Sequence, residues 1–249
     1  MSTTRTLPLD HRHGLIPIAL LPSRLVLFAA FQMLFALTVW ARTGAINLQG
    51  AGIYWPFAAT GANVVTVLIL WLVFRQEGGR LVDLYRFTKG SVGRDVLIAI
   101  AFFIVAAPVS MLPNIVLGNA LFGSVDAVTP LMFPSLPRAL AWLAISFPLT
   151  IAFAELPLYM GYILPRLAAR MKSRIWAVLI VSVFLALQHC TLPLRFDASF
   201  LLWRFGMFLP LALLMGFALN WRPRLLPYLM IGHALLDLST VVMLIGAAT

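Results

Sequence analysis

Three side chains that can activate water occur in three separate apolar segments of this chain, and they are Glu155, His189 and His233. Carboxylates and imidazoles are the groups that most often transfer protons in catalysis. An ionisable side chain at bilayer depth costs at least ~2.5 kcal/mol on insertion scales, so such residues usually face the protein interior and serve a function. The three residues therefore indicate a water-activating site inside a membrane.

A fourth ionisable residue, Asp237, follows His233 by four positions, so both lie on one face of a helix. A carboxylate beside an imidazole fixes the tautomer and orientation of the ring. The pair could also supply two metal ligands, or a helix–helix hydrogen bond that only stabilises packing. These three interpretations stay open at the level of the sequence.

The residues around Glu155 suggest a locally irregular helix. Pro157 has no backbone N–H, so it should kink the helix and free a carbonyl group for water or substrate. Gly161 permits close approach of another helix or of a peptide. We expect Pro157, Tyr159 and Gly161 to line the cavity or to contact the substrate. The structural alternative is a protonated Glu155 that hydrogen-bonds across a helix pair. Arg204 lies near the outer end of its segment and is expected to snorkel to the interface.

The elements that must position these residues are membrane helices. The chain is 62% hydrophobic and 10% charged, with a mean hydropathy of +0.98. A run of roughly 20 apolar residues spans a bilayer as a helix, and the candidate segments are 25–41, 53–74, 97–121, 139–164, 175–189, 200–219 and 226–247. We expect one polytopic all-α domain over residues 1–249, with about seven transmembrane helices. An eighth element, re-entrant or at the surface, could lie near residues 14–21.

The net charge of +10 reflects the positive-inside bias of membrane proteins rather than a nucleic-acid partner. Only Arg42, Arg138 and Arg195 fall in the connections on one side. Apart from Arg204, which lies within a helix, the other basic residues fall in the N-terminal stretch and in the connections on the opposite side. Arg24 is one of those in the N-terminal stretch. This distribution predicts a cytoplasmic N-terminus and an integral membrane protein, in the plasma or inner membrane if the source is bacterial.

Other intramembrane chemistries lack their motifs in this chain. There is no His-Glu-x-x-His zinc motif, no Gly-x-Ser-Gly serine motif and no pair of aspartates with flanking glycine. A transporter built from repeated halves is not indicated, because no matching halves occur. Zinc held by Glu155, His189 and His233 stays open beside a metal-free site, which we favour. Two other classes also stay open: a non-catalytic immunity or scaffold protein, and a proton-coupled carrier.

At these residues the chain resembles the CPBP (Abi) family, which includes the type II CAAX prenyl endopeptidases. The family's first motif, Glu-Glu-x-x-x-Arg-Gly, corresponds to the run from Glu155 to Gly161, although Leu156 and Met160 replace the second glutamate and the arginine. The second motif ends at His189, and the third, His-x-x-x-Asn/Asp, is His233 to Asp237. The order and spacing match over roughly residues 139–240.

The resemblance implies a membrane endopeptidase with a catalytic core at about residues 139–247. Glu155 would be the general base, His189 would hold the water, and His233 with Asp237 would stabilise the oxyanion. The partners implied are membrane lipid and a membrane-bound or lipidated peptide substrate. The class of substrate stays open among a lipidated protein, a peptide precursor and a transmembrane segment.

Overall fold

The computed structural model describes residues 14–249, and in this range the chain is helical and contains no β-strand. The α-helices are α1 (Ile16–Leu20), α2 (Ser23–Thr43), α3 (Leu48–Ala51), α4 (Trp55–Gln76), α5 (Val92–Phe122), α6 (Thr129–Met132), α7 (Arg138–Leu143), α8 (Ser146–Leu156), α9 (Leu164–Met171), α10 (Arg174–Leu187), α11 (Ala198–Trp221) and α12 (Leu226–Gly246). A π-helix, η5 (Pro157–Ile163), joins α8 to α9. Short 3₁₀ turns are η2 (Gly52–Tyr54), η3 (Leu81–Tyr85), η4 (Val125–Val128), η6 (Gln188–Cys190) and η7 (Pro223–Leu225).

The prediction of a polytopic helical bundle is confirmed. Six helices in the described part are long and apolar enough to cross a membrane. The predicted segment 175–189 corresponds to the shorter apolar helix Arg174–Cys190, so it does not meet the length of a full span. Residues 16–20, where an extra element was expected, form the short helix α1, which leads into α2.

The two prolines of α5, Pro108 and Pro113, do not divide it. The helix runs continuously for 31 residues. Each proline removes one backbone donor, and a membrane environment tolerates this where neighbouring groups or a local adjustment satisfy the freed carbonyl. The segment predicted at 97–121 is therefore one helix that extends beyond both expected ends.

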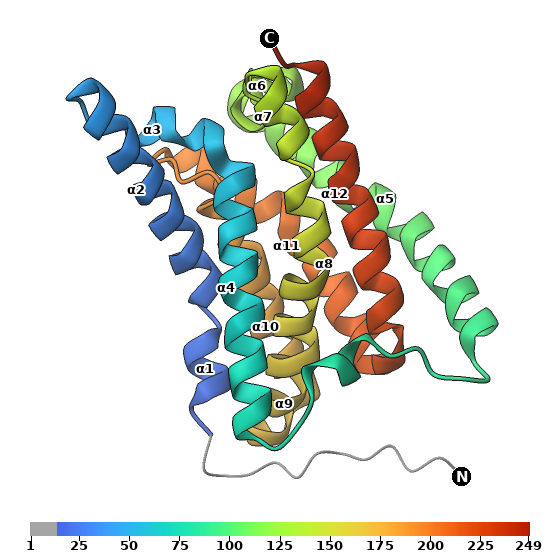
Figure 1. The fold of residues 1–249 in the computed structure, drawn as a ribbon. Coiled ribbons are helices and arrows are strands. Elements are labelled where there is room, and N and C mark those ends of the chain that lie inside the picture. Colours follow the sequence, from blue (N-terminus) through green and yellow to red (C-terminus); the bar gives the residue numbers. More distant parts are fainter. Residues whose placement is uncertain (1–13) are drawn as a thin grey trace.

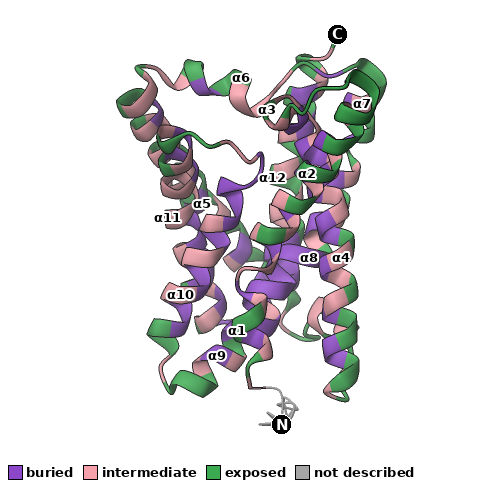
Figure 2. Ribbon diagram, turned by 90° about the vertical axis from the view of Figure 1, so that its left-hand side faces the viewer, coloured by how far each residue is buried: buried purple, intermediate pink, exposed green. Residues whose placement is uncertain are grey.

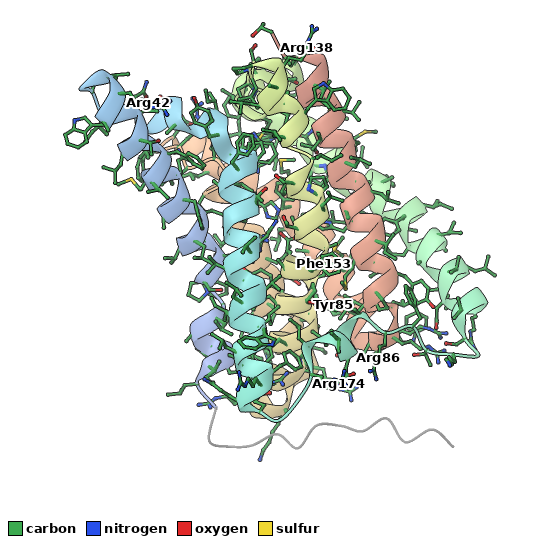
Figure 3. The ribbon with its side chains drawn as sticks, viewed as in Figure 1. Arg42, Tyr85, Arg86, Arg138, Phe153 and Arg174 are labelled. Atoms are coloured by element: carbon green, nitrogen blue, oxygen red, sulfur yellow. The ribbon has the colours of Figure 1, made fainter. Side chains whose placement is uncertain are left out.

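The helices pass from one end of the bundle to the other, and α1 and the C-terminus lie at opposite ends (Figure 1). Arg42 and Arg138 lie at one end, whereas Arg86 and Arg174 lie at the other (Figure 3). This separation follows the alternation of basic connections that the sequence predicts. A cytoplasmic N-terminus stays a prediction.

Buried residues line the inner faces of the bundle, whereas exposed residues lie mainly on its outside (Figure 2). Outward-facing apolar side chains are abundant, for example Ile104 at 69% and Leu149 at 63% exposure. A lipid-facing surface requires such side chains, because hydrocarbon is as apolar as they are. The bundle therefore has the apolar outer surface of an integral membrane protein, and several polar side chains, such as Arg24 and Glu155, are buried in its interior.

Two ion-pair clusters fix the connections at the end where α1 lies. Glu77, next to the C-terminus of α4, accepts hydrogen bonds from Tyr162 at 2.6 Å and from Arg166. These two bonds join α4 to η5 and to α9. The buried Asp95 in α5 accepts hydrogen bonds from Arg222 at 2.7 Å and from Arg224 at 3.2 Å. The first cluster holds the π-helix that follows Glu155.

Candidate functional site

Glu155 lies in the last turn of α8, directly before the π-helix η5. Pro157 cannot donate to the carbonyl of Phe153 four residues earlier, so that carbonyl loses its α-helical partner. The freed carbonyl accepts a hydrogen bond of 3.1 Å from the hydroxyl of Tyr85, and the two side chains lie together (Figure 3). The prediction that this carbonyl serves water or substrate is therefore wrong, because a loop tyrosine occupies it. The irregularity itself is present as the π-helix, a form that often accompanies functional sites.

One oxygen of the Glu155 carboxyl group faces α12. Oε1 lies 3.0 Å from Nε2 of His233, and the same Nε2 lies 3.4 Å from Oδ2 of Asp237. The Glu155 side chain is 1% exposed, His233 is 12% exposed and Asp237 is 20% exposed. Two helices thus bring together three of the four residues that the sequence singled out for catalysis.

The contacts around His233 are close but do not satisfy its polar atoms. Glu155 Oε1, both ring nitrogens of His233 and Oδ2 of Asp237 are buried atoms without a hydrogen-bond partner among the described residues. Buried polar atoms in native proteins are nearly always paired with protein or with ordered water. A cluster of such atoms on two facing helices is typical of a site that binds water or a polar ligand.

The other oxygen of Glu155 is held by two residues that the sequence analysis did not select. Oε2 accepts a hydrogen bond of 2.7 Å from the side-chain amide of Gln188, and Nη2 of Arg24 lies 3.6 Å from it. Nε of Arg24 donates to Oε1 of Gln188 at 2.6 Å. The assignment of Arg24 to the N-terminal stretch before the first membrane helix is wrong, because Arg24 lies in α2 and its side chain is 0% exposed.

The sequence holds one signal for the role of Arg24. The buried positions of α2 are Arg24, Phe28, Gln32 and Ala36, which repeat every four residues along one helix face. Two polar residues on the face that also carries Phe28 indicate that this face meets polar partners inside the bundle. Gln188 could have been suspected only from its position beside His189.

His189 lies apart from the Glu155–His233–Asp237 cluster in its contacts. Its Nδ1 is 2.9 Å from the carbonyl oxygen of Leu185, and its ring stacks on Phe208 with centroids 3.6 Å apart. This arrangement fixes the ring and leaves Nε2 without a hydrogen-bond partner among the described residues. A direct role for His189 in holding the water stays a prediction.

Arg204 does not snorkel, so that prediction is wrong. Its side chain is 2% exposed, and it donates to the carbonyl oxygens of His189 at 3.1 Å and Leu192 at 2.7 Å. Its guanidinium carbon also lies 4.8 Å from the centroid of the Phe208 ring. These bonds close the turn after α10 and hold the backbone of His189, which no local sequence pattern indicates.

The three residues expected at the cavity or the substrate pack into the protein. Pro157 is buried, and Tyr159 is 0% exposed, with its hydroxyl donating to the carbonyl of Leu21 at 3.2 Å. A Cβ atom on Gly161 would meet Leu84 at 3.0 Å and Leu226 at 3.1 Å. The close approach expected at Gly161 is therefore made by η3 and α12. Contact of these three residues with a substrate stays a prediction.

The predicted zinc ligands Glu155, His189 and His233 do not converge on one point. No three His, Cys, Asp or Glu side chains within the described range are grouped so that they could hold a metal ion. A catalytic zinc site usually needs three protein ligands, and His189 does not join the other two candidates. The residues as placed thus do not fit a zinc ion held by Glu155, His189 and His233.

A known protein family matches part of this chain. Residues 137–239 match the family model described as type II CAAX prenyl endopeptidase Rce1-like. No curated protein matches the chain, and no solved structure does. The matched residues contain α8, the π-helix and most of α12, and so contain Glu155, His233 and Asp237. The resemblance found in the sequence is thereby confirmed, and the chain is related through residues 137–239 to the CPBP family of CAAX proteases.

Proposed function

We propose that this protein is an intramembrane endopeptidase in which Glu155 activates the attacking water. One observation carries the proposal: Glu155 Oε1 lies 3.0 Å from His233 Nε2, within a cluster of buried polar atoms that have no hydrogen-bond partner among residues 14–249. A base must lie within hydrogen-bond reach of the proton that it removes, and Oε1 of Glu155 is available to a water because no described donor bonds to it. The family relationship to proteases supports the same chemistry.

The proposed reaction uses Glu155 twice, first as a base and then as an acid, and gives His233 and Asp237 one role each. Oε1 of Glu155 removes a proton from water, and the water oxygen forms a bond to the carbonyl carbon of the scissile peptide. A protonated ring nitrogen of His233 donates to the oxyanion that forms, and Asp237 orients the ring. The C–N bond then breaks as the leaving amine takes the proton from Glu155. General base catalysis contributes about 10²–10⁴-fold, and one oxyanion donor contributes about 10²–10³-fold.

The exposure of the three side chains suggests the direction of approach. Glu155 is 1% exposed, whereas His233 and Asp237 are 12% and 20% exposed. Substrate and water would therefore reach Glu155 past α12. Leu235 and Leu236 on the same helix are 62% and 45% exposed, so an apolar surface lies beside this route. We infer a substrate that is itself membrane-borne, either a lipidated peptide or a transmembrane segment.

The test is cleavage by the purified protein in liposomes. The probes are a farnesylated peptide that ends in a CAAX sequence, an unmodified copy of that peptide, and a panel of synthetic transmembrane peptides. Products are identified by mass spectrometry. We expect wild type to cleave at least one lipid-anchored or membrane-spanning probe, and Glu155→Gln to lower kcat by about 10²–10⁴-fold with KM nearly unchanged.

The control is Asp126→Asn, which neutralises an exposed acid in η4 and should leave the rate unchanged. Circular dichroism and thermal unfolding show whether each variant is folded. Full activity of folded Glu155→Gln would refute the mechanism, and no cleavage of any probe by wild type would refute the activity. If wild type cleaves no probe, the alternative is a non-catalytic role, for example protection of cells against a peptide toxin. The variant Glu155→Gln would retain that role.

A further inference from the structure

We infer that Arg24, on helix α2, is a positioning residue for Glu155 and makes α2 part of the site. This inference rests on the proposed function and extends it. Helix α2 (Ser23–Thr43) lies far from the matched residues 137–239 in the sequence. The catalytic unit would therefore include a helix outside the segment that carries the family motifs.

The three guanidinium nitrogens of Arg24 face three different elements, and Nη2 meets its element through an ion pair without a hydrogen bond among the described residues. Nε donates to Gln188 of η6 at 2.6 Å, Nη1 donates to the hydroxyl of Thr66 of α4 at 3.4 Å, and Nη2 lies 3.6 Å from Glu155 of α8. A planar guanidinium group can hold such a set, whereas the compact ammonium of lysine cannot reach all three. The side chain thus links α2 to α4, η6 and α8 at the level of the carboxyl group.

Through Gln188, this link orients the carboxyl group of Glu155. An amide has one acceptor oxygen and one donor nitrogen. Because Arg24 donates to Oε1 of Gln188, the amide nitrogen must point the other way, and it donates to Oε2 of Glu155 at 2.7 Å. Oε2 is therefore occupied, and Oε1 alone faces His233. Arg24 decides, through Gln188, which oxygen of Glu155 is free to act as the base.

The cost of burial supports a dedicated role. Arg24 and Glu155 are 0% and 1% exposed, and a buried cation is stable only where polar partners surround it. Position 160 does not supply a cation, because it is a methionine. Met160 is 6% exposed and lies in an apolar cluster. Arg24 is the arginine that contacts Glu155 among the residues that the structure describes.

The test combines kinetics with unfolding of the full-length protein in liposomes or mixed micelles. The variants are Arg24→Gln, Arg24→Lys, Gln188→Leu and, as the matched control on the same helix, Arg42→Gln, which alters an exposed arginine. We expect kcat on the cleaved probe to fall about 10²-fold in Arg24→Gln, since a misplaced base costs about this much. KM should change little, Arg24→Lys should lie between this variant and wild type, and Arg42→Gln should match wild type.

Unfolding measures the same contact without any substrate. If Arg24 acts on Glu155, the double variant Arg24→Gln/Glu155→Gln loses less in Tm than the two single losses added together, because both break one interaction. Additive losses would overturn the inference, as would a wild-type kcat in folded Arg24→Gln. If wild type cleaves no probe, the proposed function fails. The Tm measurements then decide the contact between Arg24 and Glu155 by themselves: a non-additive loss supports it, and an additive loss overturns it.

Discussion

The contacts of Arg204 yield the sharpest prediction about stability. Its guanidinium group donates to two backbone carbonyls at the end of α10, those of His189 and Leu192. The two carbonyls differ in what remains after truncation. His189 keeps a bond from the N–H of Leu192 at 3.3 Å, whereas the carbonyl of Leu192 has no second partner within the described chain. Arg204→Met therefore leaves the carbonyl of Leu192 unpaired and leaves the carbonyl of His189 with one hydrogen bond where it had two.

The magnitude follows from these two losses. An unpaired buried carbonyl costs about 1–3 kcal/mol, and the loss of one of two bonds at the other costs about 0.5–1.5 kcal/mol. Removing the buried cation recovers part of its own desolvation cost. We expect the free energy of unfolding to fall by about 2–3 kcal/mol. Arg204→Lys should lose less, because an ammonium group can still donate to one of the carbonyls.

The assay is denaturant titration in mixed micelles, with Arg138→Met as the control because Arg138 is exposed at the end of the bundle. Cleavage by the same variants should also decline in Arg204→Met, because its bond to His189 holds the turn that carries Gln188. Unchanged unfolding in Arg204→Met would refute this reasoning, because it would mean that the two bonds to backbone carbonyls contribute nothing to stability.

Two further predictions concern the end of the bundle where α1 lies. Tyr85→Phe removes the donor to the carbonyl of Phe153 and should lower the unfolding free energy by about 1 kcal/mol. Burial raises the pKa of Tyr85 from 10.0 to about 12, so the stability that the neutral hydroxyl contributes is complete below pH 10 and is lost as the pH rises through 12. Thermal unfolding over a pH series should therefore show a smaller alkaline loss of stability in the variant than in wild type. Asp95→Asn leaves Arg222 and Arg224 without their shared carboxylate and should cost about 3–5 kcal/mol, which denaturant titration checks; an effect below 1 kcal/mol would mean that water already screens this cluster.

Much of the fold and part of the site could be predicted from the sequence. Apolar length and the alternation of basic connections indicate membrane helices directly, because burial in lipid and charge placement act locally along the chain. His233 and Asp237 share a helix face through their spacing of four residues. Glu155 stands out because an acid within an apolar run is costly unless it has a function. These features need no knowledge of which helices are neighbours.

Tertiary structure alone decided which side chains meet. The bond between Arg24 and Gln188 joins residues that are 164 positions apart, and no helical period relates residues on different helices. The same limit explains Arg204, whose position in the sequence suits snorkelling but whose partners lie in a turn packed against α11. Local patterns give the cost of burying a charge, whereas only the packing of helices provides the partners that offset it.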